Sequence, residues 1–113
     1  MASIPLNYFR RVTTLVTTTP TVVYTAPDRR AGIILSGLAT NLTGSTQTIT
    51  VGISGSDGAY HDILHGFPVP SNDALNVAVG KLVLGTADQL VTYSTENSAL
   101  NFTLSVLEAV NTP

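Results

Sequence analysis

The chain has 113 residues, a net charge of −2 at pH 7 and a charged fraction of only 11%, against about 25% in an average soluble domain. This length favours one domain with a single core, and the slightly acidic balance argues against nucleic acid or an anionic membrane as a partner. The chain has no cysteine, which excludes disulfides and thiolate chemistry, and no apolar run approaches the roughly 20 residues that span a bilayer.

The first segment, residues 1–9, differs from the rest of the chain and lacks the basic and apolar regions of a signal peptide. Four apolar side chains fall in it: Ile4, Leu6, Tyr8 and Phe9. Pro5 interrupts it, and proline cannot donate to a strand ladder. We therefore predict an N-terminal arm at 1–9 and a sandwich domain at 10–113. Two interpretations stay open: the arm docks on a neighbouring subunit, or it forms a short strand that closes its own sandwich.

After this arm, short runs of Thr, Val, Leu and Ile alternate with a period of two, separated by turn signals rich in Gly, Pro, Asn and Asp. Strands are predicted at residues 11–18, 21–25, 32–41, 46–54, 59–65, 74–79, 81–84, 89–95 and 99–108. Many short strands with regular turns, and no convincing helical period, indicate an all-β chain. We therefore predict a single domain that folds as an antiparallel β-sandwich, or jelly-roll-like.

The alternation also predicts which side chains face the core. On the last strand, Phe102 is expected to be buried and Thr103 to face outward. Val91 and Tyr93 are expected to share the apolar face of their strand, opposite Thr92.

His61 and His65 have the spacing of the zinc-protease motif, which requires a helix to bring both imidazoles to one side. Gly58, Gly66 and Pro68 flank the pair and favour a strand, on which the two side chains would lie about 13 Å apart. That separation is too large for a shared metal ion, and the chain has no third histidine and no cysteine. We predict no metal site and no cofactor, and the two histidines are polar strand positions at a candidate interface.

Catalysis finds no support in the sequence. There is no Gly-x-Ser-x-Gly elbow, no phosphate-binding loop and no dinucleotide-binding fingerprint, so we predict no catalytic residues. A carbohydrate-binding module is a remoter alternative, because jelly rolls include lectin domains. Against it, the chain has no Trp, and its four Tyr and three Phe form no evident stacking platform.

Four of the five basic residues form two adjacent pairs: Arg10, Arg11, Arg29 and Arg30. Neighbouring residues of a strand point to opposite faces, so neither pair can line one patch. One interpretation is simple solvation at strand ends. The other is ion pairing with an acidic group across a subunit contact, for which the planar guanidinium is well suited.

Several segments resemble small virion structural proteins of tailed phages, in particular those of cyanophages. The segments that carry the resemblance are residues 23–27 (VYTAP), 39–44 (ATNLTG), 48–53 (TITVGI), 67–73 (FPVPSND), 80–84 (GKLVL), 87–90 (ADQL) and 104–108 (LSVLE). Their order and spacing extend over residues 7–112. The resemblance implies a β-sandwich subunit of the phage particle and carries no catalytic residues.

Composition and resemblance together predict a non-enzymatic virion structural protein. Thr-rich strands with few charges would leave exposed edges in a monomer, so we expect a homo-oligomer such as a trimer. Within the virion we favour a capsid decoration or cement subunit that contacts the major capsid protein, assembled in the host cytoplasm. The alternative is a neck, tail, baseplate or fibre component.

Overall fold

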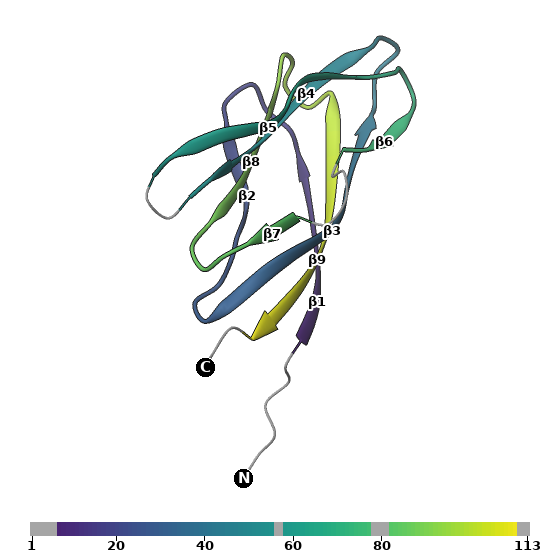
Figure 1. Ribbon diagram of the computed structural model, residues 1–113. Helices are drawn as coiled ribbons and strands as arrows, with labels where there is room; N and C mark the ends of the chain where they lie inside the picture. Colours follow the sequence, from purple (N-terminus) through teal and green to yellow (C-terminus); the bar gives the residue numbers. More distant parts are fainter. Residues whose placement is uncertain (1–6, 56–57, 78–81, 111–113) are drawn as a thin grey trace.

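The computed structural model describes residues 7–55, 58–77 and 82–110, which form two antiparallel sheets packed against each other (Figure 1). Sheet A has the order β1–β9–β3–β6, with β7 also paired to β3. Its strands are β1 (Asn7–Leu15), β3 (Arg30–Asn41), β6 (Ala74–Asn76), β7 (Leu82–Leu84) and β9 (Leu100–Val110). Sheet B has the order β2–β8–β4–β5. Its strands are β2 (Thr21–Thr25), β4 (Gln47–Ser54), β5 (Tyr60–Val69) and β8 (Gln89–Ser94). The predicted single-domain antiparallel sandwich is confirmed.

Each predicted strand has a counterpart in the described part of the chain. The start of β1 and the end of β5 differ most. Strand β1 begins at Asn7 instead of residue 11, and β5 continues to Val69, through Pro68, instead of ending at residue 65. Proline is tolerated there because β5 is an edge strand, and its pairing with β4 is irregular between Ile49 and Val51. Gly66, with φ of +58°, lies within this irregular stretch.

The first strand begins inside the segment predicted as an arm. Strand β1 starts at Asn7 and pairs with β9 of the same chain from Asn7 opposite Ala109 to Leu15 opposite Asn101. Residues 7–9 are therefore part of sheet A at the level of the backbone. Ile4 and Leu6 lie outside the described residues, so the docking of the remaining arm stays a prediction.

The core lies between the sheets and follows the alternation of β9 and β4. Phe102 and Leu104 are buried, whereas Thr103 is partly exposed, as predicted. On β4, Ile49 and Val51 point inward towards them. Complete burial of a large apolar side chain contributes about 1.5–3 kcal/mol, so this alternation fixes which side of each strand faces inward.

Strand β8 contradicts its predicted orientation. Leu90 and Thr92 are each 1% exposed and face the core, because they lie opposite the inward residues Ile53 and Val51 of β4. Val91 and Tyr93 therefore point to the outer side of sheet B, the reverse of the sequence interpretation. The apolar residue that determines the orientation is Leu90, and the hydroxyl of Thr92 is tolerated inside.

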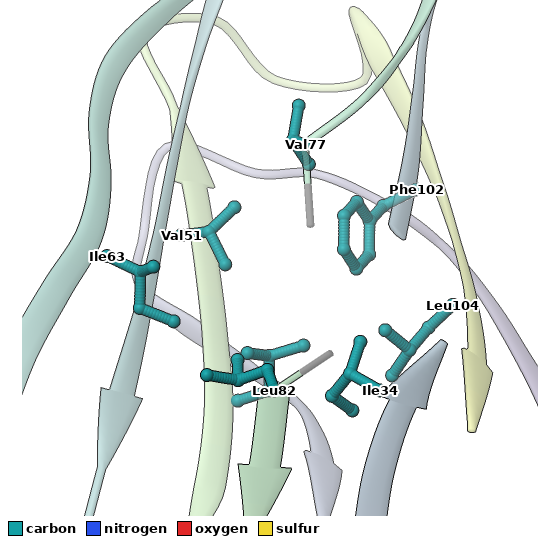
Figure 2. A pocket seen from close by; sticks show the side chains of 8 residues that line it. Ile34, Val51, Ile63, Val77, Leu82, Phe102 and Leu104 are labelled. Carbon is teal, nitrogen blue, oxygen red and sulfur yellow. The ribbon is translucent and has the colours of Figure 1, made fainter. Parts of the chain in front are cut away.

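A small cavity of about 30 Å³ remains between the sheets (Figure 2). Its lining is apolar and comes from both sheets, including Ile34 and Phe102 of sheet A and Val51 of sheet B. A space of this size could hold a single water molecule, but it offers none of the polar partners that a buried water needs. We therefore regard it as a packing gap and not as a ligand site.

Candidate assembly surface

The outward face of sheet A carries a row of apolar side chains that crosses four strands. Phe9 of β1 lies opposite Leu107 of β9, which lies opposite Ile33 of β3, which in turn lies opposite Val83 of β7. Residues directly opposite one another share a face of the sheet. Phe9 and Val83, at the two ends of the row, are 77% and 62% exposed, and the two central side chains are partly exposed.

Charge is almost absent from this face. Among the described strand residues that the pairing directs outward, Arg11 is the only charged one. Leu15 and Leu38 add further exposed apolar surface. Four strands about 4.8 Å apart, with some nine residues at about 3.3 Å each, give roughly 600 Å² of flat sheet. Polar side chains such as Thr13, Thr103 and Ser105 share this area, so the apolar row is one band across the face. Exposed apolar bands of this kind mark interaction sites in soluble proteins.

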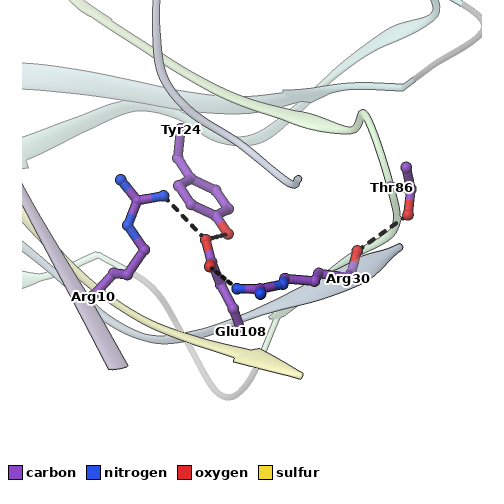
Figure 3. Close-up of polar contacts among 5 residues, drawn as sticks. All are labelled: Arg10, Tyr24, Arg30, Thr86 and Glu108. Carbon is purple, nitrogen blue, oxygen red and sulfur yellow. Dashed lines mark hydrogen bonds and ion pairs between the residues drawn. The ribbon is translucent and has the colours of Figure 1, made fainter. Parts of the chain in front are cut away.

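A buried carboxylate lies on the inner side of the same strands (Figure 3). The side chain of Glu108 is only 2% exposed. Its Oε2 atom accepts a hydrogen bond of 2.6 Å from the Tyr24 hydroxyl and one of 3.1 Å from Arg10 Nη1, and its Oε1 atom accepts one of 3.5 Å from Arg30 Nη1. Because Tyr24 belongs to sheet B, this cluster joins the two sheets. Gly32 leaves room for it, since a Cβ there would lie 2.8 Å from the Tyr24 ring.

The electrostatics of this cluster favour the ionised carboxylate. Burial raises the pKa of Glu108, but the hydrogen bonds from Tyr24, Arg10 and Arg30 and the positive charge of Arg10 outweigh it and hold this pKa below its usual value. Burial and the neighbouring carboxylate raise the pKa of the Tyr24 hydroxyl. The tyrosine thus remains a neutral donor, and the cluster fixes the start of β1 and the end of β9 against sheet B.

The outward face of sheet B has a different shape. A hollow of about 350 Å³ opens on it, lined by Tyr60 of β5, Tyr93 of β8 and neighbouring residues of β2, β4 and β8. Tyr60 donates a hydrogen bond of 2.5 Å to Asp62 Oδ1. The hollow includes polar groups as well as aromatic rings, whereas the described outward face of sheet A carries an apolar row and a single charged residue.

The two predicted interface histidines are both on β5 and both exposed, and they do not share a site. His65 Nδ1 lies 2.8 Å from Asp62 Oδ2, and the His65 side chain is 74% exposed. Hydrogen bonds from Tyr60 and His65 hold the pKa of the Asp62 carboxyl below its usual value. His61 lies opposite Ile53 in the neighbouring strand.

The four predicted interface arginines divide into two groups. Arg10 and Arg30 have their acidic partner, Glu108, in the same chain. Arg11 points to the outer face of sheet A, beside the apolar row, and Arg29 is exposed in the turn before β3 with φ of +60°. Of the predicted aromatic pair, Phe9 begins the apolar row, and the side chain of Tyr8 lies outside the described residues.

Three residues of the row were not identified from the sequence: Ile33, Val83 and Leu107. The signal was present, because each belongs to a run of consecutive apolar residues: 33–35, 82–84 and 106–107. Such runs break the alternation, so one member must face outward on a strand. What the sequence could not supply was the strand order that brings the three outward members into line.

The described residues contain no cluster of three or more His, Cys, Asp or Glu that could hold a metal ion. In the same residues we find no helix with the length and hydropathy to cross a membrane.

Comparison with known proteins identifies the fold. No protein-family model and no curated protein matches the chain. Among solved structures, a chain from the disulfide-linked pili that form Bacillus endospore appendages aligns with a TM-score of 0.56 and 9% identity, covering 93% of this chain and 88% of that one. A chain from the acid-stable capsid of Helicobacter pylori bacteriophage KHP30 aligns with a TM-score of 0.55 and 11% identity, covering 96% and 90%. The chain is therefore similar in fold to a pilus protein and a phage capsid protein.

Proposed function

We propose that this chain is a non-enzymatic structural subunit of a phage virion that assembles with copies of itself through the outward face of sheet A. The observation that carries the proposal is the row from Phe9 to Val83, which lies on a sheet face whose described strand residues include a single charged one, Arg11. In a dilute monomer this row would be exposed to water. Covering Phe9, which is now 77% exposed, would recover much of the roughly 1.5–3 kcal/mol that burial of such a side chain contributes.

The size of the face supports a contact between copies. Stable interfaces bury about 800 Å² on each partner, and the roughly 600 Å² of flat sheet in this face becomes larger once side chains are counted. The chain has no cysteine, so such a contact cannot be a disulfide, unlike the linkage of the disulfide-linked pili. The similarity in fold to a phage capsid protein and the sequence resemblance to virion proteins favour the particle as its location.

Within the virion, the finer form of the proposal is a capsid decoration or cement subunit that contacts the major capsid protein. The small size of the sandwich is suited to bridging neighbouring capsid proteins. A neck, tail, baseplate or fibre position is the alternative. Mass spectrometry of purified particles tests the virion assignment, and absence of the chain from them would refute it. A reconstruction of the particle then separates head from tail.

Self-assembly is tested by sedimentation of purified protein. The wild type should associate at micromolar concentration, and Phe9→Asp and Val83→Asp should each raise the dissociation constant at least tenfold, because a carboxylate would be buried in the contact. Both side chains are exposed, so neither change should alter the folded subunit. Leu42→Asp is the matched control, since Leu42 is 55% exposed but lies outside the row. A wild type that stays monomeric, or three variants with equal effects, would refute this interface.

A further inference from the structure

The hollow on sheet B depends on the reversed orientation of β8 and on one glycine. Val91 and Tyr93 point outward, and Val22 of β2 lies opposite Val91. On the other side, Gly52 of β4 allows the Tyr60 ring to lie across the sheet, since a Cβ at position 52 would collide with that ring. The Tyr60 ring is thus supported by the β4 backbone below it and oriented by its hydrogen bond to Asp62.

The chemistry of the hollow favours an uncharged, extended segment with apolar side chains. Ser54 and Gln89 add a hydroxyl and an amide to the lining, and both can bond to backbone groups. Burial and the Asp62 carboxylate raise the pKa of the Tyr60 hydroxyl, which therefore stays neutral. The same carboxylate disfavours an anionic ligand. Grooves lined by aromatic rings that also offer hydrogen-bonding groups recognise proline-containing segments, whose extended backbone makes no internal hydrogen bonds.

We propose that this hollow receives residues 1–6 of a second copy of the chain. The segment Met-Ala-Ser-Ile-Pro-Leu has no charged side chain and has Pro5 between two large apolar residues, Ile4 and Leu6. It continues directly from β1, whose first residue is Asn7. The inference rests on self-assembly of the subunit and names a second contact surface for it.

The assignment to a second copy follows from where the segment leaves the fold. Strand β1 is an edge strand of sheet A beside β2, and Arg10 lies over the Tyr24 ring. Asn7 lies three residues beyond Arg10, whereas Val22 in the hollow lies two residues from Tyr24 in the opposite direction. At about 3.3 Å per residue, a path within the same subunit would cover about 16 Å along the strands as well as the step from one sheet to the other. Six residues in an extended polyproline conformation reach only about 19 Å. Two sheets packed about 10 Å apart, with side chains on both outer faces, leave little of that length for a path around the same subunit.

The test uses a protein that lacks residues 1–6, which retains every described strand, and a synthetic peptide of those residues labelled at its carboxyl end. Fluorescence anisotropy should show saturable binding with a dissociation constant below about 1 mM. Tyr93→Ala and Gly52→Ala should each weaken binding at least tenfold, the second because it displaces the Tyr60 ring. Thr48→Ala is the matched control, on the same face but outside the hollow, and should bind as the unsubstituted protein does.

The peptide itself supplies a second control. Replacing Ile4 and Leu6 with Ser should abolish binding, since the hollow then gains no apolar contact. Failure of the peptide to bind, or equal binding to Tyr93→Ala and Thr48→Ala, would overturn the inference. Peptide binding at the hollow together with a full-length protein that remains a monomer would place the segment in its own subunit and overturn the assignment to a second copy.

These outcomes are separable from the proposed function. If full-length protein associates and Phe9→Asp weakens that association, self-assembly through sheet A stands even when the peptide does not bind. If the peptide binds at the hollow but Phe9→Asp does not change self-association, the proposed contact through sheet A is refuted. The proposed contact between residues 1–6 and the hollow then stands.

Discussion

The two outward faces of the sandwich are both apolar in part, but they arise in different ways. On sheet A, runs of consecutive apolar residues place Ile33, Val83 and Leu107 outside, in line with Phe9, and the result is a nearly uncharged face. On sheet B, the orientation of β8 turns Tyr93 outward beside Tyr60, and the result is a hollow. The difference shows that strand order and orientation, more than composition, decide what kind of partner a sheet face can accept.

The difference between the two faces depends most on the orientation of β8, and substitutions on its two sides test that orientation. Thr92→Asp should destabilise the fold by at least about 4 kcal/mol, because it buries a carboxylate without a partner. Tyr93→Asp should cost about 1 kcal/mol or less, since this position faces outward. Urea denaturation of the two variants measures both values. Equal losses, or a larger loss for Tyr93→Asp, would mean that the hollow is not on the surface.

The inward side of sheet A can be tested in the same way on β9. Phe102→Ala should cost about 3–5 kcal/mol, because the side chain is 1% exposed in the core. Thr103→Ala should cost under about 1 kcal/mol in the isolated subunit. If Thr103→Ala were as destabilising as Phe102→Ala in urea, the outward direction of the apolar row would be wrong, because Leu107 shares its face with Thr103.

The Glu108 cluster links the two sheets. Loss of its carboxylate should therefore lower the free energy of unfolding nearly as much as Phe102→Ala does. Glu108→Gln leaves Arg10 and Arg30 without their carboxylate and should destabilise by about 3 kcal/mol, the low end for a buried pair because Arg10 is half exposed. Arg10→Gln should cost under about 1 kcal/mol, since surface pairs contribute little.

The same carboxylate predicts a direction for the pH dependence. The pKa of Glu108 is lowered in the folded state from its ordinary value of 4.5, so the unfolded chain binds the proton more readily. The stability it contributes is present above pH 4.5 and is lost as the pH falls from there through the folded-state pKa. Thermal melts of wild type and Glu108→Gln between pH 7 and about pH 3 should converge on acidification. Parallel curves would show that this group does not titrate as proposed.

The smallest expected effect concerns salt and distinguishes an apolar contact from an ionic one. With Arg11 as the only charged residue on the described outward face of sheet A, the dissociation constant should change less than about threefold between about 0.05 M and about 0.5 M NaCl. Sedimentation at several salt concentrations measures it. A loss of tenfold or more at high salt would indicate that the arginines, and not the apolar row, dominate the contact.

Much of the fold could be predicted from the sequence because alternation is a local signal. The strands, the buried Phe102 and the outward Thr103 follow from the pattern of β9 alone. Strand β8 could not be oriented in this way, since Val91 and Tyr93 on one face compete with Leu90 on the other and only the pairing with β4 decides between them.

The candidate surface could be predicted even less well from the sequence, because it forms only when strands far apart in the chain pair with one another. Phe9 was identified because it is a large aromatic side chain near the start of the chain. Its three neighbours in the row come from strands far apart in sequence, and only the strand order brings them together. The Glu108 cluster is similar: ion pairing was one of two interpretations of the arginines, with the acidic partner expected across a subunit contact. The carboxylate lies in the same chain instead, and neither it nor its contact with Tyr24 could be inferred from spacing.

The long ladder between β1 and β9 also has a mechanical consequence. Because the two strands are antiparallel, Asn7 and Ala109 lie directly opposite each other at one end of the ladder. A force that pulls these two residues apart would act across the strands and open the hydrogen-bonded pairs one after another, beginning with Asn7 and Ala109. A force applied across the outward face of sheet A would instead be shared among many hydrogen-bonded pairs of the ladder at the same time. A subunit of this design should therefore resist tension well when its partners hold it by its faces and poorly when they hold it by its two ends.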